Sequence, residues 1–288
     1  MLRVLLMLVG SGAPSAAAIS ADTPWAILQE AAEDKSADKR ALAAHALGLL
    51  PKNKKAQAMV EKALLDGNPH VRIAAAKALG DMGARSARPK LRKTLNDTEV
   101  SVVIAAANAL YVLKDPAAYE VYYALLTGER KSSQGLVHSE LQILKDRKSM
   151  EKLIFETGIG FVPFGGMGYE AWKTITKDNT SAVRIAAAER LAKDPDPKSG
   201  RALAESCSDN KSSVREAAVD ALAVRGDPAM VDVLMPLLND GNDGVRYDAA
   251  AAILRLKSHG RIGRVRRGRG VTAPAPSQPR PAPSAARK

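Results

Sequence analysis

One sequence pattern recurs at a fixed spacing, and it limits the possible folds more than any other feature. The segment from Asp66 to Gly80 reads DGNPHVRIAAAKALG, and a related segment begins thirty-one residues later at Asp97. Further copies begin at Asp34, Asp178, Asp209 and Asp240. Repeats of this length indicate a solenoid, in which similar units stack on one another.

Each copy has the features of a helical hairpin. The DGNP tetrapeptide at Asp66 is typical of a turn that leads into a helix, because Asp and Asn bond nearby backbone and Pro suits the first helical turn. The apolar residues that follow have helical spacing on one face: Val71, Ala74, Ala75, Ala78 and Leu79. A second amphipathic helix is expected over 85–95. One hairpin cannot bury its apolar face alone, so the hairpins must stack.

The repeated segment D-x-x-P-x-V-R-x-A-A-A-x-A-L-G resembles the HEAT repeat, in the short form grouped with phycobilisome-lyase-like proteins. The resemblance covers roughly residues 22–257. It implies an all-α solenoid of about seven helical hairpins with an irregular fifth. The first hairpin is expected over 22–50, at one exposed end of the stack, with Trp25, Ile27 and Leu28 covering its apolar end.

The resemblance also implies a structural role for the recurring Asp and Arg residues, which should form a ladder of bonds between neighbouring repeats. The expected ladder residues are Asp34, Arg40, Asp66, Arg72, Asp97, Asp178, Arg184, Asp209, Arg215, Asp240 and Arg246. Val103 replaces the Arg in the copy that begins at Asp97. The ladder is therefore expected to lapse in that repeat.

The positive charge of the chain is concentrated near its C-terminus. The formal net charge is +12, but residues 255–288 contain ten Lys or Arg and no acidic residue, so the rest of the chain is nearly neutral. Residues 258–288 are Pro- and Ala-rich and are expected to be a disordered tail. Three interpretations stay open: a solvated tail, contact with nucleic acid or an anionic surface, or a frameshifted reading frame.

Residues 1–18 resemble a secretory signal peptide, with Arg3 before an apolar run over 4–9 and a small-residue site at 16–18. This predicts an exported chain, periplasmic or secreted, without a transmembrane segment once processed. The alternative is a cytoplasmic protein whose N-terminus is an ordinary helix.

The repeat register is lost over about 128–177, where a Gly-rich run at 158–168 is surrounded by aromatic residues. Two interpretations compete. The aromatics fill a gap between irregular repeats, or they form a recognition loop, because aromatic residues are common binding hot spots. The candidate partner-binding residues are Phe161, Phe164, Tyr169 and Trp172, with Tyr122 and Tyr123 as weaker candidates. The glycine spacing does not match a phosphate-binding loop.

The sequence predicts no catalytic or metal-binding residue. Its histidines are scattered and form no pair with a second ligand at helical spacing: His45, His70, His138 and His259. The recurring His-Glu pairs of HEAT-like deoxyhypusine hydroxylases are absent, and Cys207 is the single cysteine. We therefore expect no cofactor and a non-catalytic scaffold that binds an unknown protein partner on its concave face. A phycobilisome-lyase-like, chromophore-handling enzyme is the alternative.

Overall fold

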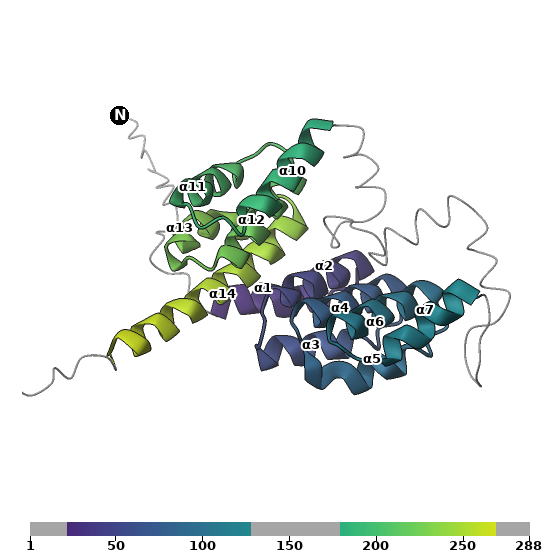
Figure 1. Cartoon of the computed structure of the whole chain (residues 1–288). Coiled ribbons are helices and arrows are strands. Elements are labelled where there is room, and N and C mark those ends of the chain that lie inside the picture. Colours follow the sequence, from purple (N-terminus) through teal and green to yellow (C-terminus); the bar gives the residue numbers. More distant parts are fainter. Residues whose placement is uncertain (1–21, 128–178, 269–288) are drawn as a thin grey trace, which may run out of the picture.

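The computed structural model describes residues 22–127 and 179–268, and every regular element in these two ranges is helical (Figure 1). The first range contains three complete hairpins and the first helix of a fourth. Its elements are α1 (Asp22–Ala32), α2 (Ala37–Gly48), α3 (Lys54–Ala63), α4 (Pro69–Asp81), the 3₁₀ turn η2 (Arg85–Ala87), α5 (Arg88–Thr94), α6 (Val100–Val112) and α7 (Ala117–Thr127). The sequence-based expectation of an all-α solenoid is confirmed.

The second range begins with the second helix of a hairpin and continues with two complete hairpins. Its elements are α10 (Asn179–Leu191), α11 (Pro197–Ser206), α12 (Ser212–Arg225), η4 (Pro228–Met230), α13 (Val231–Leu234), η5 (Met235–Asn239) and α14 (Asp243–Gly268). The first helix of the last hairpin is therefore split into η4, α13 and η5, with prolines at 228 and 236 limiting its regularity.

The local sequence explains where these helices begin and end. Before α4, the Asn68 side chain accepts a hydrogen bond from the His70 backbone N–H at 2.9 Å, and Pro69 occupies the first helical turn. At the C-terminal end of α12, Gly226 has a φ of 74°, a left-handed conformation that glycine adopts without a Cβ clash. Turn chemistry thus sets the helix boundaries.

Small residues let the second helices of neighbouring hairpins pack closely. A Cβ atom at Gly48 would lie 3.1 Å from the Cα of Ala78, and one at Gly80 would lie 3.2 Å from the Cα of Ala109. These contacts join α2 to α4 and α4 to α6. The alanine-rich repeat therefore gives short distances between helix axes, as its composition predicts.

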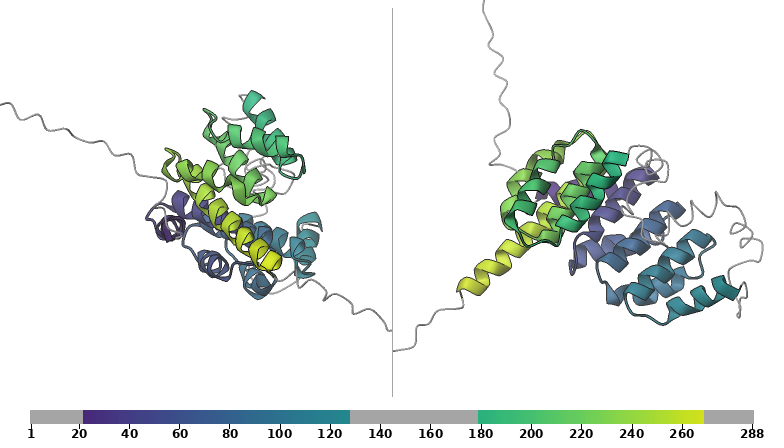
Figure 2. Two further views of the ribbon diagram at one scale, coloured as in Figure 1. Left: turned by 90° about the vertical axis from the view of Figure 1, so that its left-hand side faces the viewer. Right: turned by 45° about the horizontal axis from the view of Figure 1, so that its top comes forward.

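The hairpins do not stack in chain order. Helix α14 packs against α12 on one side and against α1 and α2 on the other, while α2 packs on α4 and α4 on α6. The long second helices therefore form one layer in the order α10, α12, α14, α2, α4, α6. Figures 1 and 2 show α14 passing from the green helices of the second range to α1 of the first.

This order corrects the expectation that the first hairpin lies at an exposed end. Leu28 of α1 is fully buried and belongs to the same hydrophobic cluster as Leu256 of α14, while Trp25 and Ile27 are partly buried against that cluster. Across the same junction, Arg255 Nη1 donates a hydrogen bond to the Leu49 carbonyl oxygen at 3.1 Å. Within the described residues, the stack ends at α7 and α10 instead.

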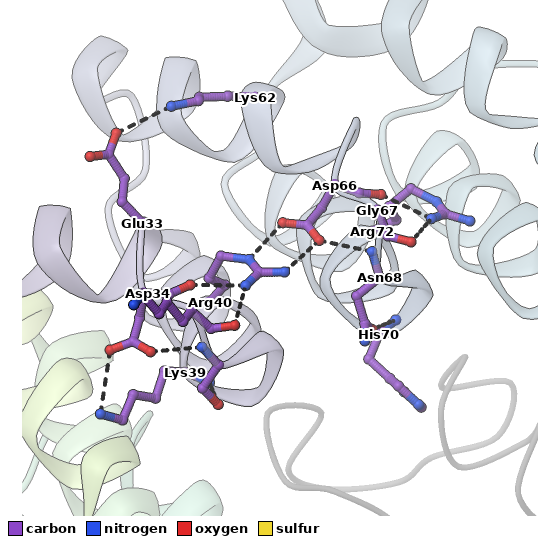
Figure 3. A network of polar contacts seen from close by, with 12 residues as sticks. Glu33, Asp34, Lys39, Arg40, Lys62, Asp66, Gly67, Asn68, His70 and Arg72 are labelled. Carbon is purple, nitrogen blue, oxygen red and sulfur yellow. Dashed lines mark hydrogen bonds and ion pairs between the residues drawn. The ribbon is translucent and has the colours of Figure 1, made fainter.

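Arginine–aspartate pairs join successive hairpins at their turns (Figure 3). Arg40 Nε and Nη2 donate to the two carboxylate oxygens of Asp66 at 2.7 and 2.8 Å, and Arg40 Nη1 donates to the Asp34 carbonyl oxygen. The same arrangement recurs in the pairs Arg72–Asp97 and Arg215–Asp240, whereas Arg184 donates to Asp209 through Nη1 alone and to Ser181 Oγ through Nη2. Each arginine thus connects its own turn to the next one.

The ladder is interrupted at two described positions. Val103 is fully buried, and the next turn is held from a different helix, because Arg92 of α5 pairs with Asp115 at 2.9 Å. At the junction, Arg246 pairs with Asp243 of its own turn, and Asp34 accepts from Lys39. Asp178 lies outside the described residues.

The C-terminal boundary of the folded region differs from the expectation. The tail was expected to begin at residue 258, but α14 continues to Gly268 and extends beyond its neighbouring helices (Figures 1 and 2). The physical reason is that the stretch from residue 258 to Pro274 contains no earlier proline to end the helix. The glycines at 260 and 263 each cost a helix only about 1 kcal/mol.

Replacing Arg72 by Ala should lower the free energy of unfolding by about 2 kcal/mol, because it leaves the Asp97 carboxylate and two turn carbonyls without their donor. Both side chains of this pair are only 12–13% exposed, so solvent screens them weakly. Lys62→Ala is the matched control: its pair with Glu33 is more than 70% exposed, and its loss should change stability by less than about 0.5 kcal/mol. Urea denaturation measures both; equal effects would contradict the ladder's role.

The shared core predicts that the two described ranges stay associated after the chain between them is cut. A specific protease site inserted within 128–178 should yield two fragments that co-elute as one species in size-exclusion chromatography, since α14 buries apolar surface against α1 and α2. Elution of two separate species in native buffer would show that the stack is not continuous across the junction.

Candidate functional site

Three potential metal-ligating side chains from distant parts of the chain converge at the junction. His45 comes from α2, Asp220 from α12 and Asp248 from α14. One nitrogen or oxygen atom from each lies within 4.8 Å of the others, and His45 Nε2 is 3.6 Å from Asp220 Oδ2. We call these three residues the junction cluster.

The repeat itself explains why these side chains meet. The position eleven residues after the first Asp of each copy is occupied in turn by His45, Lys77, Asn108, Glu189, Asp220 and Ala251. In the stacking order, Ala251 of α14 lies between Asp220 and His45. Asp248 precedes Ala251 by three residues and so shares its face of the helix. It reaches the two flanking side chains from that position.

Two acidic residues near the junction replace apolar residues of the repeat pattern. Asp248 occupies the position of Ala74 and Ala105, and Glu216 occupies the position of the buried residues Ile73 and Ile104. A Cβ at Gly244 would lie 2.5 Å from Glu216 Oε1, so the end of the Glu216 side chain lies close against the first turn of α14. These departures are the signal that could have identified the site from the sequence.

Burial and mutual charge shift the ionisation of the junction cluster. Asp248 is only 4% exposed. Its burial, together with the Asp220 charge, raises the pKa of its carboxyl group well above the usual value. Burial opposes protonation of His45, but its ion pair with Asp220 and the charges of Asp248 and Asp81 raise its pKa to about 9. His45 is therefore cationic at neutral pH, and it pairs with Asp220.

Other charged groups surround the junction cluster. Burial raises the pKa of Glu216 to about 7, with the Asp220 charge adding to the effect. On α4, burial raises the pKa of Asp81 and lowers that of Lys77. On α14, Arg255 interacts electrostatically with Asp220. Despite these neighbours, the Asp220 Oδ1 atom is buried and has no hydrogen-bond partner among the described residues.

A second surface feature lies where α6 meets α7. Tyr111, Tyr119 and Tyr122 pack edge to face, with ring centroids 6.1–6.5 Å apart. Tyr111 is 49% exposed, Tyr119 50% and Tyr123 65%, and the adjacent Val112 is 57% exposed. We call Tyr111, Val112, Tyr119 and Tyr123 the tyrosine patch.

The two weaker candidates for partner binding therefore differ in their environment. Tyr123 is exposed, whereas Tyr122 is half-buried and its hydroxyl donates a hydrogen bond to Asn108 Oδ1 at 2.7 Å. The other four candidates lie outside the described residues, and both interpretations of their segment stay predictions: Phe161, Phe164, Tyr169 and Trp172.

The other described residues considered for catalysis, His70 and Cys207, lie in different hairpins. His70 is exposed in the first turn of α4, and His138 lies outside the described residues. Cys207 is buried at the end of α11, and burial raises its thiol pKa to about 12. A thiol with such a pKa is not a nucleophile at neutral pH.

Stacked helical hairpins joined by turn ladders define an α-solenoid protein, and comparison with known proteins specifies which kind. A family model for HEAT repeats matches residues 25–127 and 170–254. The chain therefore belongs to the HEAT-repeat family, which generally provides scaffolds for protein interaction.

Individual known proteins add little to this assignment. An engineered protein whose crystal structure was solved by the Northeast Structural Genomics Consortium is 18% identical, and the match covers 83% of this chain and 97% of that one. Its TM-score of 0.25 is too low to support an argument. No curated protein matches the chain significantly. In the described ranges, no helix combines the length and apolarity needed to cross a membrane.

The buried thiol gives a direct test of this structure. Cys207 in the native protein should react with a disulfide reagent at pH 8 at least about a hundredfold more slowly than a free thiol, because burial both blocks access and suppresses the thiolate. In concentrated urea the same cysteine should react at the ordinary rate. Rapid reaction in native buffer would contradict its position in the core.

Proposed function

We propose that this HEAT-repeat chain is a non-catalytic scaffold that binds a protein partner through the tyrosine patch. The single observation that supports this most directly is the exposure of three tyrosines and a valine together where α6 meets α7. Exposed apolar groups that gather on one surface are more informative than isolated ones. The family's general role in protein interaction supports the same class of function.

The chemistry of the tyrosine patch suits protein binding. A tyrosine ring supplies a large contact area with few rotatable bonds, and its hydroxyl can bond a partner or water. The edge-to-face contacts of Tyr119 with Tyr111 and Tyr122 hold the rings before any partner arrives. Less side-chain freedom is then lost on binding, which favours affinity.

We propose that the aromatic residues of the irregular segment extend this surface. That segment follows α7 directly in the chain, which supports a shared location with the patch. Under this proposal Phe161, Phe164, Tyr169 and Trp172 contact the same partner. We also propose that the protein is exported, on the strength of the signal-like residues 1–18, so the search for a partner begins with the exported fraction of the host.

Binding through the tyrosine patch is tested with the double variant Tyr119→Ser/Tyr123→Ser. Partner capture by the tagged full chain should fall at least about tenfold, because aromatic hot spots carry much of an interface's binding energy. Circular dichroism should show that the double variant still folds, since both side chains are at least half exposed. Leu65→Ser is the matched control: Leu65 is 86% exposed but lies outside the patch, so capture should be unchanged.

Three results would contradict this proposal. Undiminished capture by the double variant would remove the patch from the interface. A bound chromophore in the captured material would favour the lyase-like alternative. Binding that disappears on deletion of residues 258–288 and at high salt would favour contact of the tail with a polyanion.

A further inference from the structure

We propose that His45, Asp220 and Asp248 bind one divalent transition-metal ion, zinc foremost, at the junction where α14 packs against α2. The sequence alone predicts no metal site, and the proposed scaffold function does not require one. The proposal rests on the donor types, their distances and their unmet bonding capacity.

The donor set suits zinc. One imidazole nitrogen and two carboxylate oxygens are ordinary zinc ligands, and three protein ligands leave a fourth position for water. Ligands at about 2.0–2.1 Å on a tetrahedral zinc lie about 3.3–3.4 Å from one another. His45 Nε2 and Asp220 Oδ2 are already 3.6 Å apart, and all three ligating atoms lie within 4.8 Å of one another. Side-chain rotations that move these atoms by roughly 1 Å would bring them to the distances of a tetrahedral zinc site.

The cluster contains a buried carboxylate oxygen that accepts no hydrogen bond from the described residues. Asp248 is 4% exposed, and its ligating oxygen lies within 4.8 Å of the ligating atoms of His45 and Asp220. The oxygen that accepts no bond from the described residues is Asp220 Oδ1. Leaving carboxylate oxygens buried and unpaired is costly. A cation between the two carboxylates would remove that cost.

The groups around the cluster carry both charges, and the cluster is open to solvent. The acidic Glu216 and Asp81 lie near the cluster, opposed by the cationic Lys77 and Arg255. The side chains of His45 and Asp220 are 23% and 31% exposed, so the site is reachable from solvent. Magnesium and calcium prefer shells made entirely of oxygen, whereas the imidazole favours zinc and similar ions.

Metal binding here would have a structural consequence. The ligands come from α2 in the first described range and from α12 and α14 in the second. One ion would therefore connect the two halves of the stack at the contact that makes them a single core. Because the site exists only when the halves are docked, binding should stabilise that docking.

Calorimetric titration of the chelator-treated full chain with zinc chloride tests the proposal, with magnesium chloride as the comparison ion. We expect one equivalent of zinc to bind, a higher melting temperature with zinc and no such response to magnesium. Asp248→Asn and His45→Gln should each weaken zinc binding at least about a hundredfold. His70→Gln is the matched control, because His70 is exposed and outside the cluster; its zinc affinity should equal that of the wild type.

Each other outcome overturns the proposal. The absence of one-equivalent zinc binding would mean that the cluster is only an ion pair between repeats. Zinc binding that survives both cluster substitutions would belong to histidines elsewhere in the chain. Asp248→Asn keeps the size of the side chain and removes a buried charge, so it should fold even if His45→Gln does not. Circular dichroism of each variant checks this point.

Discussion

The packing of α14 between α12 and α2 is the contact on which the rest of this structure depends. Without it, the described chain would be two short stacks, each with an uncovered apolar side, and repeat proteins need neighbours to bury such surfaces. Because α14 fills this place, Leu28, Leu47 and Leu256 share one hydrophobic cluster. The first and last described hairpins consequently become the centre of the stack rather than its ends.

The same contact explains why the junction has its own chemistry. Elsewhere, a turn arginine reaches the aspartate of the next hairpin and fixes the register between repeats. At the junction, Arg246 stays within its own turn, while His45 pairs with Asp220 and Arg255 donates to the Leu49 carbonyl oxygen. Polar residues at positions where other copies have Ala or Ile weaken simple hydrophobic packing. Departures of this kind often mark functional sites.

The two candidate surfaces lie in different parts of the stack. The junction cluster is central, where helices from both described ranges meet, whereas the tyrosine patch is at the α7 end. A partner on the patch and an ion at the junction would therefore act on separate contacts. The metal would strengthen the core that supports the patch without touching the partner.

The sequence by itself determined the hairpin, its length, its turns and most of the ladder, because these depend on residues that are near one another in the chain or recur at a fixed spacing. It also placed Tyr122 and Tyr123 among the candidates, although only the structure separates the exposed ring from the hydrogen-bonded one.

Only the tertiary structure decided the order of stacking. Every copy has a similar apolar face, so local pattern does not specify which two faces meet. The convergence of His45 with Asp220 and Asp248 follows from that choice and has no local signature beyond two acidic residues at apolar repeat positions.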